Sequence, residues 1–194
     1  LGRVNQKDVD ERSLCNDLNN GRVFDQALDQ LNLCIRDEFK FSAIAIARIT
    51  NSLSKKHYKQ PLNIFIVYLI QSKLLETRID SFKPQDLAMI ANGASKCSER
   101  LCEEVMAAIK DKISDTRGFK PQAIAMIANG ASKCSERLCE EVMAAIKYKI
   151  SDTRGFESQH IAMIANGASK CSERLCEEVM AAIKDKISDT CCFK

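Results

Sequence analysis

The chain contains three consecutive near-copies of one 37-residue segment. Residues 119–155 differ from residues 82–118 at three positions, and residues 156–192 differ from residues 119–155 at six. A diverged copy spans residues 41–81, in which 46–55 aligns with 87–96. A period of this length is typical of helical-repeat arrays, because a single hairpin cannot bury its apolar face without neighbours. The repeat therefore predicts an all-α fold, an α-α superhelix built as one solenoid domain of helical hairpins.

Each full unit is predicted to form two helices. Pro84 suits the first position of the first helix, and Ser98 suits the N-cap of the second. Gly93 is costly inside a helix, which indicates close helix packing or fraying, whereas Gly118 and Gly155 are expected to end second helices as C′ residues. Apolar residues at helical spacing form one face of each helix. They are Leu87, Ala88, Ile90, Ala91 and Ala94 in the first helix, and Leu101, Val105, Ala108, Ile109 and Ile113 in the second, with Cys102 and Met106 beside them.

The N-terminal third is less regular. Residues 1–40 are predicted to be an irregular or helical segment, with one helix over 22–37 and with residues 1–21 as a loop or a short capping helix. Residues 60–75 are predicted to form the second helix of the diverged copy. At the other end, Leu175, Val179, Ile183 and Ile187 are expected to form an apolar face that no following unit covers, so that the isolated chain would self-associate.

Composition excludes several classes of function. The longest apolar run, 64–70, is far shorter than the roughly 20 residues that span a bilayer. The ten cysteines include no Cys-x2-Cys pair, and His57 and His160 lie near no acidic or cysteine cluster that would bind a metal. The sequence also lacks a glycine-rich phosphate loop and a local nucleophile arrangement. We therefore expect no membrane span, no cofactor, no small-molecule substrate and no enzymatic activity.

Six of the cysteines form three copies of one Cys-x4-Cys pair. Cys97 is expected at the turn between the two helices and Cys102 in the second helix. Equivalent cysteines of adjacent units are expected about 8–10 Å apart, which is beyond the reach of a disulfide. Burial as small apolar residues is the better interpretation of these positions.

A polar stripe lies opposite the apolar face of each first helix and could contact RNA. Lysine can neutralise phosphate, while asparagine and glutamine can hydrogen-bond sugars or bases. The alternative is an ordinary solvated face. One position of the first helix varies between units, as Asp86, Ala123 and His160, and could set specificity or reflect neutral drift. The candidate RNA-binding residues are Asn51, Lys55, Gln85, Asn92, Lys96, Gln122, Asn129, Lys133, Gln159, Asn166 and Lys170.

The opening of the first helix, residues 82–91 with the sequence FKPQDLAMIA, resembles the octotricopeptide and heptatricopeptide repeats. The resemblance covers 82–192 well, 41–81 weakly and 1–40 not at all. The sequence departs from the pattern at Asn92, Asn129 and Asn166, where these repeats commonly carry an aromatic residue, and it contains no RAP domain. Such repeats occur in organellar RNA-binding proteins and in mitochondrial ribosomes.

The resemblance implies an RNA-associated structural protein of the mitochondrial ribosome, or of another organellar ribonucleoprotein, that contacts ribosomal RNA and neighbouring proteins. It also implies a mitochondrial location, with the targeting peptide expected to be absent from this chain. Charge limits the expected affinity, because units 82–192 carry equal numbers of basic and acidic residues. The alternative function is a protein-binding scaffold of the tetratricopeptide type that makes no contact with RNA.

Overall fold

The computed structural model describes residues 9–20, 23–55, 58–72 and 81–191. Within these ranges the chain forms ten helices and no strand, which confirms the all-helical prediction. The helices are α1 Glu11–Asn19, α2 Phe24–Arg36, α3 Ala43–Leu53, α4 Lys59–Gln71, α6 Pro84–Ala94, α7 Glu99–Asp115, α8 Pro121–Ala131, α9 Glu136–Ser151, α10 Ser158–Ala168 and α11 Glu173–Cys191. Both helices predicted for each full unit are present.

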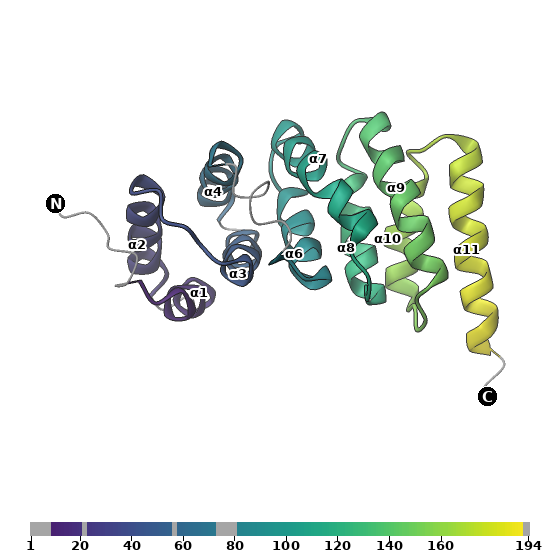
Figure 1. Cartoon of the computed structure of the whole chain (residues 1–194), viewed down its shortest axis with the longest axis horizontal. Helices are drawn as coiled ribbons and strands as arrows, with labels where there is room; N and C mark the ends of the chain where they lie inside the picture. The colour runs from purple at the N-terminus through teal and green to yellow at the C-terminus, as the bar shows by residue number, and fades with distance from the viewer. Residues whose placement is uncertain (1–8, 21–22, 56–57, 73–80, 192–194) are drawn as a thin grey trace.

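The helices pack as hairpins that contact one another in chain order. Helices α1, α3, α6, α8 and α10 form a first-helix row, in which each helix contacts the next. Helices α2, α4, α7, α9 and α11 form a second-helix row with the same succession of contacts. Figure 1 shows the helices following one another along the long axis of the molecule, from α1 and α2 at the N-terminal end to α10 and α11 at the C-terminal end. These contacts are compatible with a helical repeat.

The hairpin packing extends into the N-terminal segment that the sequence left irregular. Residues 11–19 form a helix, and α1 packs against both α2 and α3. Leu14, Cys15 and Leu18 of α1 are buried. The short-helix alternative for this segment is therefore correct for the residues that the structure describes, while residues 1–8 and 21 lie outside them.

The apolar faces predicted for the first helices are buried where units lie on both sides of the helix. In α6, all five predicted residues are inaccessible to solvent, and α8, packed between α6 and α10, repeats this burial. In α10 the burial is partial, because Ala162 is exposed. The buried face of α7 differs from the prediction, because Cys102 and Met106 are fully buried at its centre whereas Leu101 and Ala108 are half-buried. The next unit covers this side of α7, where the Cys102 thiol reaches the Gly130 carbonyl at 3.5 Å.

Glycine allows the first helices to approach closely. A Cβ atom at Gly130 would lie 3.0 Å from the carbonyl oxygen of Ala91, and one at Gly167 would lie 2.9 Å from that of Ala128. At Gly93 the corresponding neighbour is Thr50, whose Cγ2 would lie 2.3 Å away. Close helix packing is therefore the reason for glycine at this position of the repeat.

The predicted ends of the helices are partly correct. Helix α6 begins at Pro84, and the Leu101 N–H donates to the Ser98 hydroxyl at 3.4 Å, as expected for an N-cap. The prediction for Gly118 and Gly155 is wrong, because α7 already ends at Asp115 and α9 at Ser151. Both glycines lie in the loops between units, with φ of +77° and +80°. They serve a left-handed loop position that an L side chain rarely adopts.

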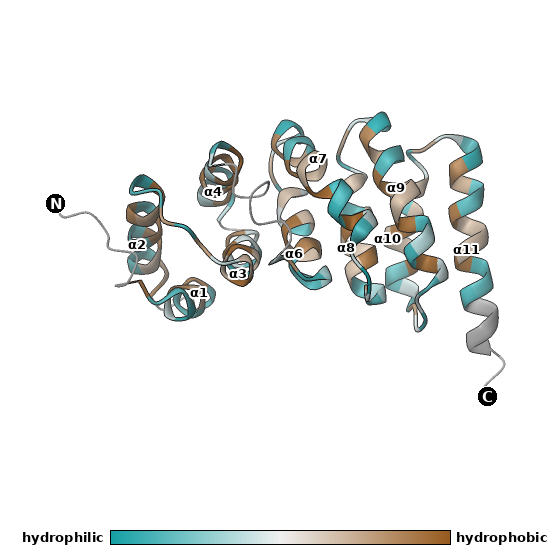
Figure 2. Ribbon diagram, in the orientation of Figure 1, coloured by the Kyte–Doolittle hydropathy of each residue, from teal (hydrophilic) through white to brown (hydrophobic). Residues whose placement is uncertain are grey.

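The last helix is covered by the unit before it. Leu175, Val179 and Ile183 are buried where α11 packs against α9 and α10, so the expected uncovered apolar face is wrong for these residues. Among the residues of α11 whose side chains the structure describes, Met180 is an exposed large apolar residue, at 38% exposure. Figure 2 shows hydrophobic residues, in brown, alternating with hydrophilic residues, in teal, along the ribbons of the helices. The side chain of Ile187 lies outside the described residues.

In the described ranges, no helix combines the length and the apolar composition that crossing a membrane requires.

Candidate nucleic-acid interface

Four lysines follow the C-terminal ends of successive first helices. Helices α3, α6, α8 and α10 end two residues before their lysine, and all four lysines are exposed. A serine separates each lysine from its helix, and the serine hydroxyl donates to the carbonyl of the asparagine three residues earlier at 2.7–2.9 Å. The four turns thus have one geometry. The lysines, named here the lysine ladder, are Lys55, Lys96, Lys133 and Lys170.

Hydrogen bonds connect neighbouring rungs of the ladder. Lys96 Nζ donates to Ser54 Oγ at 3.3 Å, which places it beside the turn that carries Lys55. Lys55 Nζ in turn donates to Asn19 Oδ1 at the end of α1, at 2.7 Å. Asn166 Nδ2 donates to Ser132 Oγ at 3.1 Å, next to Lys133. Polar contacts therefore join the first rung to the second and the third rung to the fourth.

The charges of the ladder are not neutralised by carboxylates. Within the described part of the chain, no Asp or Glu oxygen forms an ion pair with any of its four lysines. Their polar partners in the structure, where they have one, are the neutral groups of Asn19 and Ser54. A positive charge that is exposed and unpaired remains available to an anionic partner.

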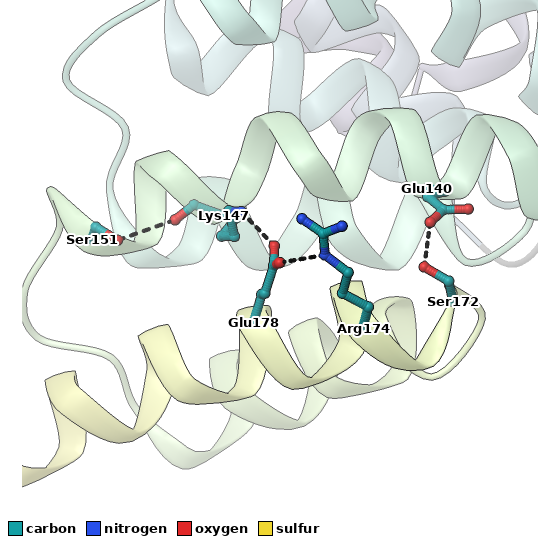
Figure 3. A network of polar contacts seen from close by, with 6 residues as sticks. All are labelled: Glu140, Lys147, Ser151, Ser172, Arg174 and Glu178. Atoms are coloured by element: carbon teal, nitrogen blue, oxygen red, sulfur yellow. Dashed lines mark hydrogen bonds and ion pairs between the residues drawn. The ribbon is translucent and has the colours of Figure 1, made fainter.

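The second-helix row uses its charges differently. Lys147 of α9 pairs with Glu178 of α11 at 2.6 Å, and Arg174 pairs with the same carboxylate at 3.0 Å. Figure 3 shows this network, together with the Ser172 hydroxyl that donates to Glu140. Lys147 and then Arg174 hold the pKa of Glu178 below its ordinary value. At this junction both cations of the second-helix row are therefore paired with a carboxylate.

One unit earlier, the same contact is made by Lys110 of α7 and Glu141 of α9. The hydrogen bond from Lys110 holds the pKa of Glu141 below its ordinary value, and Glu141 raises the pKa of Lys110. The repetition shows that these ion pairs belong to the junction between units.

The structure brings only part of the predicted stripe together. Asn51 and Asn166 are exposed, and Asn92 and Asn129 are half-buried, one turn before their lysines. The glutamines Gln85, Gln122 and Gln159 are exposed in the first turn of their helices, and each precedes its lysine by eleven residues. A rise of about 1.5 Å per residue puts them about 16 Å from the ladder. A single strand of RNA that followed the lysines would lie close to the asparagines and far from the glutamines.

The variable position of the first helix caps the helix. Asp86 is buried, at 6% exposure, and its carboxylate accepts from the Lys83 N–H at 3.0 Å. His160 Nδ1 accepts from the Glu157 N–H at 3.2 Å in the same way. Ala123 is buried and has no side-chain acceptor. The sequence analysis considered this position only for specificity or drift and missed its capping role, although an acidic residue three positions after the N-cap is a known capping signal.

The described residues contain no group of three or more His, Cys, Asp and Glu side chains that could hold a metal ion. A hollow of about 750 Å³ lies between α2 and α4, where Ile35, Asn63 and Val67 contribute to its lining. It is separate from the lysine ladder. His57 lies outside the described residues.

No protein-family model, no curated protein and no solved structure matches the chain.

Proposed function

We propose that this chain is an α-α superhelical repeat protein that binds RNA as a structural, non-catalytic component of a mitochondrial ribonucleoprotein, namely the mitochondrial ribosome. It would contact ribosomal RNA through the first-helix row and neighbouring proteins elsewhere. The 37-residue repeat and the succession of helix contacts support the superhelix. The organellar assignment rests on the resemblance of residues 82–91 to the heptatricopeptide repeats.

The observation that carries the RNA proposal is the contrast in charge pairing. The lysine ladder is exposed and pairs with no described carboxylate, whereas Lys110 and Lys147 of the second-helix row are bound to glutamates. Free cations repeated at equal structural positions suit a polymer with one negative charge per nucleotide. Amide side chains one turn earlier suit sugar and base edges.

The balanced overall charge sets the expected strength of binding. Because acidic residues offset the basic ones across the units, attraction is local to the ladder, and affinity should be modest and strongly dependent on salt. Such an interface fits a protein held in a large assembly by several contacts at once.

The test replaces all four ladder lysines with glutamate. This variant should lose crosslinking to single-stranded RNA while keeping its helicity, because none of the four side chains is buried. The matched control changes four basic residues at the opposite ends of the first helices to glutamate, which gives the same change in net charge. The control residues are Lys83, Arg117, Lys120 and Arg154. RNA crosslinking that is equal in the parent and in the ladder variant would contradict the interface and favour the protein scaffold.

A single substitution measures one contact. Lys133→Gln should weaken RNA binding and lower the slope of log affinity against log salt by about one.

The ribonucleoprotein assignment has a separate test, in which nuclease treatment of a mitochondrial extract should release the protein from its complex. Retention of the protein in a nuclease-treated complex would support binding through protein contacts instead.

A further inference from the structure

Two pairs of cysteines meet across the junctions between units. Cys102 Sγ and Cys134 Sγ are 3.8 Å apart, and Cys139 Sγ and Cys171 Sγ are 3.9 Å apart. Each pair joins the second helix of one unit to the inter-helix turn of the next unit. Sequence reasoning compared equivalent cysteines of adjacent units and therefore missed these contacts, which join the two different cysteines of the repeat.

The two thiols of each pair converge on one backbone carbonyl. The Gly130 carbonyl accepts from Cys102 Sγ at 3.5 Å and from Cys134 Sγ at 3.8 Å. The Gly167 carbonyl accepts in the same way from Cys139 Sγ at 3.4 Å and from Cys171 Sγ at 3.7 Å. A shared acceptor holds both sulfur atoms on the same side of the junction. The same geometry therefore occurs at two junctions.

A third turn cysteine provides a comparison without a thiol partner. Cys97 Sγ donates to the Gly93 carbonyl at 3.8 Å, as its counterparts do in their own units. In the preceding hairpin, however, α4 has its buried positions at Leu62, Phe65, Ile66 and Leu69, which match those of Cys102, Val105, Met106 and Ile109 in α7. Leu62 thus stands where the later units have a cysteine.

We propose that the Cys102–Cys134 and Cys139–Cys171 pairs are oxidation sites, at which a small hydroperoxide closes a disulfide between successive units. One thiol, as its thiolate, attacks an oxygen of hydrogen peroxide and becomes a sulfenic acid. The hydroxide that leaves takes up the thiol proton to form water. The second sulfur then attacks the sulfenic sulfur, and the displaced oxygen leaves as a second water. The two thiols lose two hydrogen atoms and two electrons, and one peroxide becomes two waters.

Burial makes the two pairs react at different rates. Cys102 and Cys134 are both buried, with Cys134 at 5% exposure, whereas Cys171 is half-buried beside the fully buried Cys139. Burial raises the pKa of Cys171 to about 12, and it also raises the pKa of Cys139, so both groups are thiols at neutral pH. The reaction is therefore slow. The Cys139–Cys171 pair closes first, because peroxide reaches Cys171 more easily.

The experiment counts thiols in the intact protein, because trypsin would release identical cysteine peptides from all three units. The folded chain is treated with hydrogen peroxide, alkylated in denaturant and weighed by mass spectrometry. The parent should lose four thiols in two phases, and dithiothreitol should restore all four. Cys134→Ser and Cys171→Ser should each lose two fewer thiols than the parent, and the double variant four fewer. Cys171→Ser should lack the faster phase.

Cys97→Ser is the matched control and should lose as many thiols to disulfides as the parent does. Serine keeps a hydroxyl that can donate to the same glycine carbonyl, and circular dichroism checks that each variant retains its helicity. Equal losses in the parent and in the double variant would overturn the proposal, as would a smaller loss in Cys97→Ser. Oxidation of the four cysteines in urea but not in the folded chain would overturn it too, since the folded geometry would then not bring the sulfur atoms together.

Discussion

The first-helix row and the second-helix row are held together by different kinds of contact. In the first row, glycine lets one helix lie against the backbone of the next, as Gly130 does against Ala91. In the second row, long charged side chains bridge the helices, as Lys147 and Glu178 do. The ladder lysines hydrogen-bond only neutral groups of the neighbouring unit, as Lys96 does with Ser54, so their charges stay free for an external anion. In the second row, Lys110 and Lys147 pair with glutamates of the next unit.

The largest effect is expected where the first row depends on the absence of a side chain. Gly130→Val should lower the free energy of unfolding by about 3 kcal/mol, because added methyl groups would press on the Ala91 backbone. Chemical denaturation measures the loss. Helix propensity alone would favour valine over glycine. Ala162→Val, at an exposed position of α10, is the control for a branched side chain in a first helix that meets no neighbouring backbone. Equal stability of the two variants would show that the close approach is not what joins the first helices.

A smaller effect is expected where a side chain of the second row caps the next unit. The Ser135 hydroxyl, at the N-cap of α9, donates to Glu103 of α7. Glu103→Ala should cost about 1 kcal/mol of unfolding free energy, because the N-cap loses its acceptor. Glu104→Ala is the matched control, since Glu104 pairs with Arg100 of its own helix. If Glu103→Ala and Glu104→Ala had the same melting temperature, the Ser135–Glu103 contact would not stabilise the junction.

The first row can also be strengthened at the capping position. Ala123→Asp should raise the free energy of unfolding by about 0.5 kcal/mol, because an acidic side chain there would accept from the Lys120 N–H and favour the helix dipole. The nearly identical unit before it already holds Asp86 in this arrangement. Ala123→Asn lacks the charge and should give less stabilisation in the same urea titration. A lower stability of Ala123→Asp would indicate that α8 has no room for the carboxylate.

The smallest effect is expected from the ion pairs of the second row. The pKa of Glu178 is held below its ordinary value in the folded chain, so the pair stabilises the fold at neutral pH and is lost as pH falls through that lowered pKa. The melting temperature of the parent should therefore drop more between about pH 5 and about pH 3 than that of Glu178→Gln. Solvent screening keeps the difference small. Parallel pH profiles would show that the pair adds nothing to stability.

Local features of the fold could be predicted from the sequence, because they depend on residues a few positions apart. The helices of each unit, the buried face of α6, the start at Pro84 and the cap at Ser98 all follow from spacing within one unit. The position of Gly118 was misjudged because α7 ends at Asp115 through its own Thr116 cap. Nothing in the local pattern distinguishes a glycine in the loop after a helix from a glycine at the C′ position of that helix.

Contacts between units could not be predicted, because they depend on how far one hairpin is shifted against the next. The pairing of Cys102 with Cys134 is of this kind, as is the bond between Ser135 and Glu103. The RNA-binding candidates show the same limit. The sequence placed glutamine, asparagine and lysine on one stripe, but helix length separates Gln85 from Lys96, and the serine that connects the rungs was not singled out.

The junctions between the repeats are alike, and this has a consequence for how the gene that encodes the chain can change. Each junction takes one set of groups from the second helix of a repeat and a complementary set from the turn and second helix of the next, as with Cys139 and Cys171 or Lys147 and Glu178. A copy inserted in frame by unequal recombination would therefore meet both neighbours with groups that already fit. The array can grow or shrink by whole units without any compensating mutation, while the number of rungs presented to a partner changes in step.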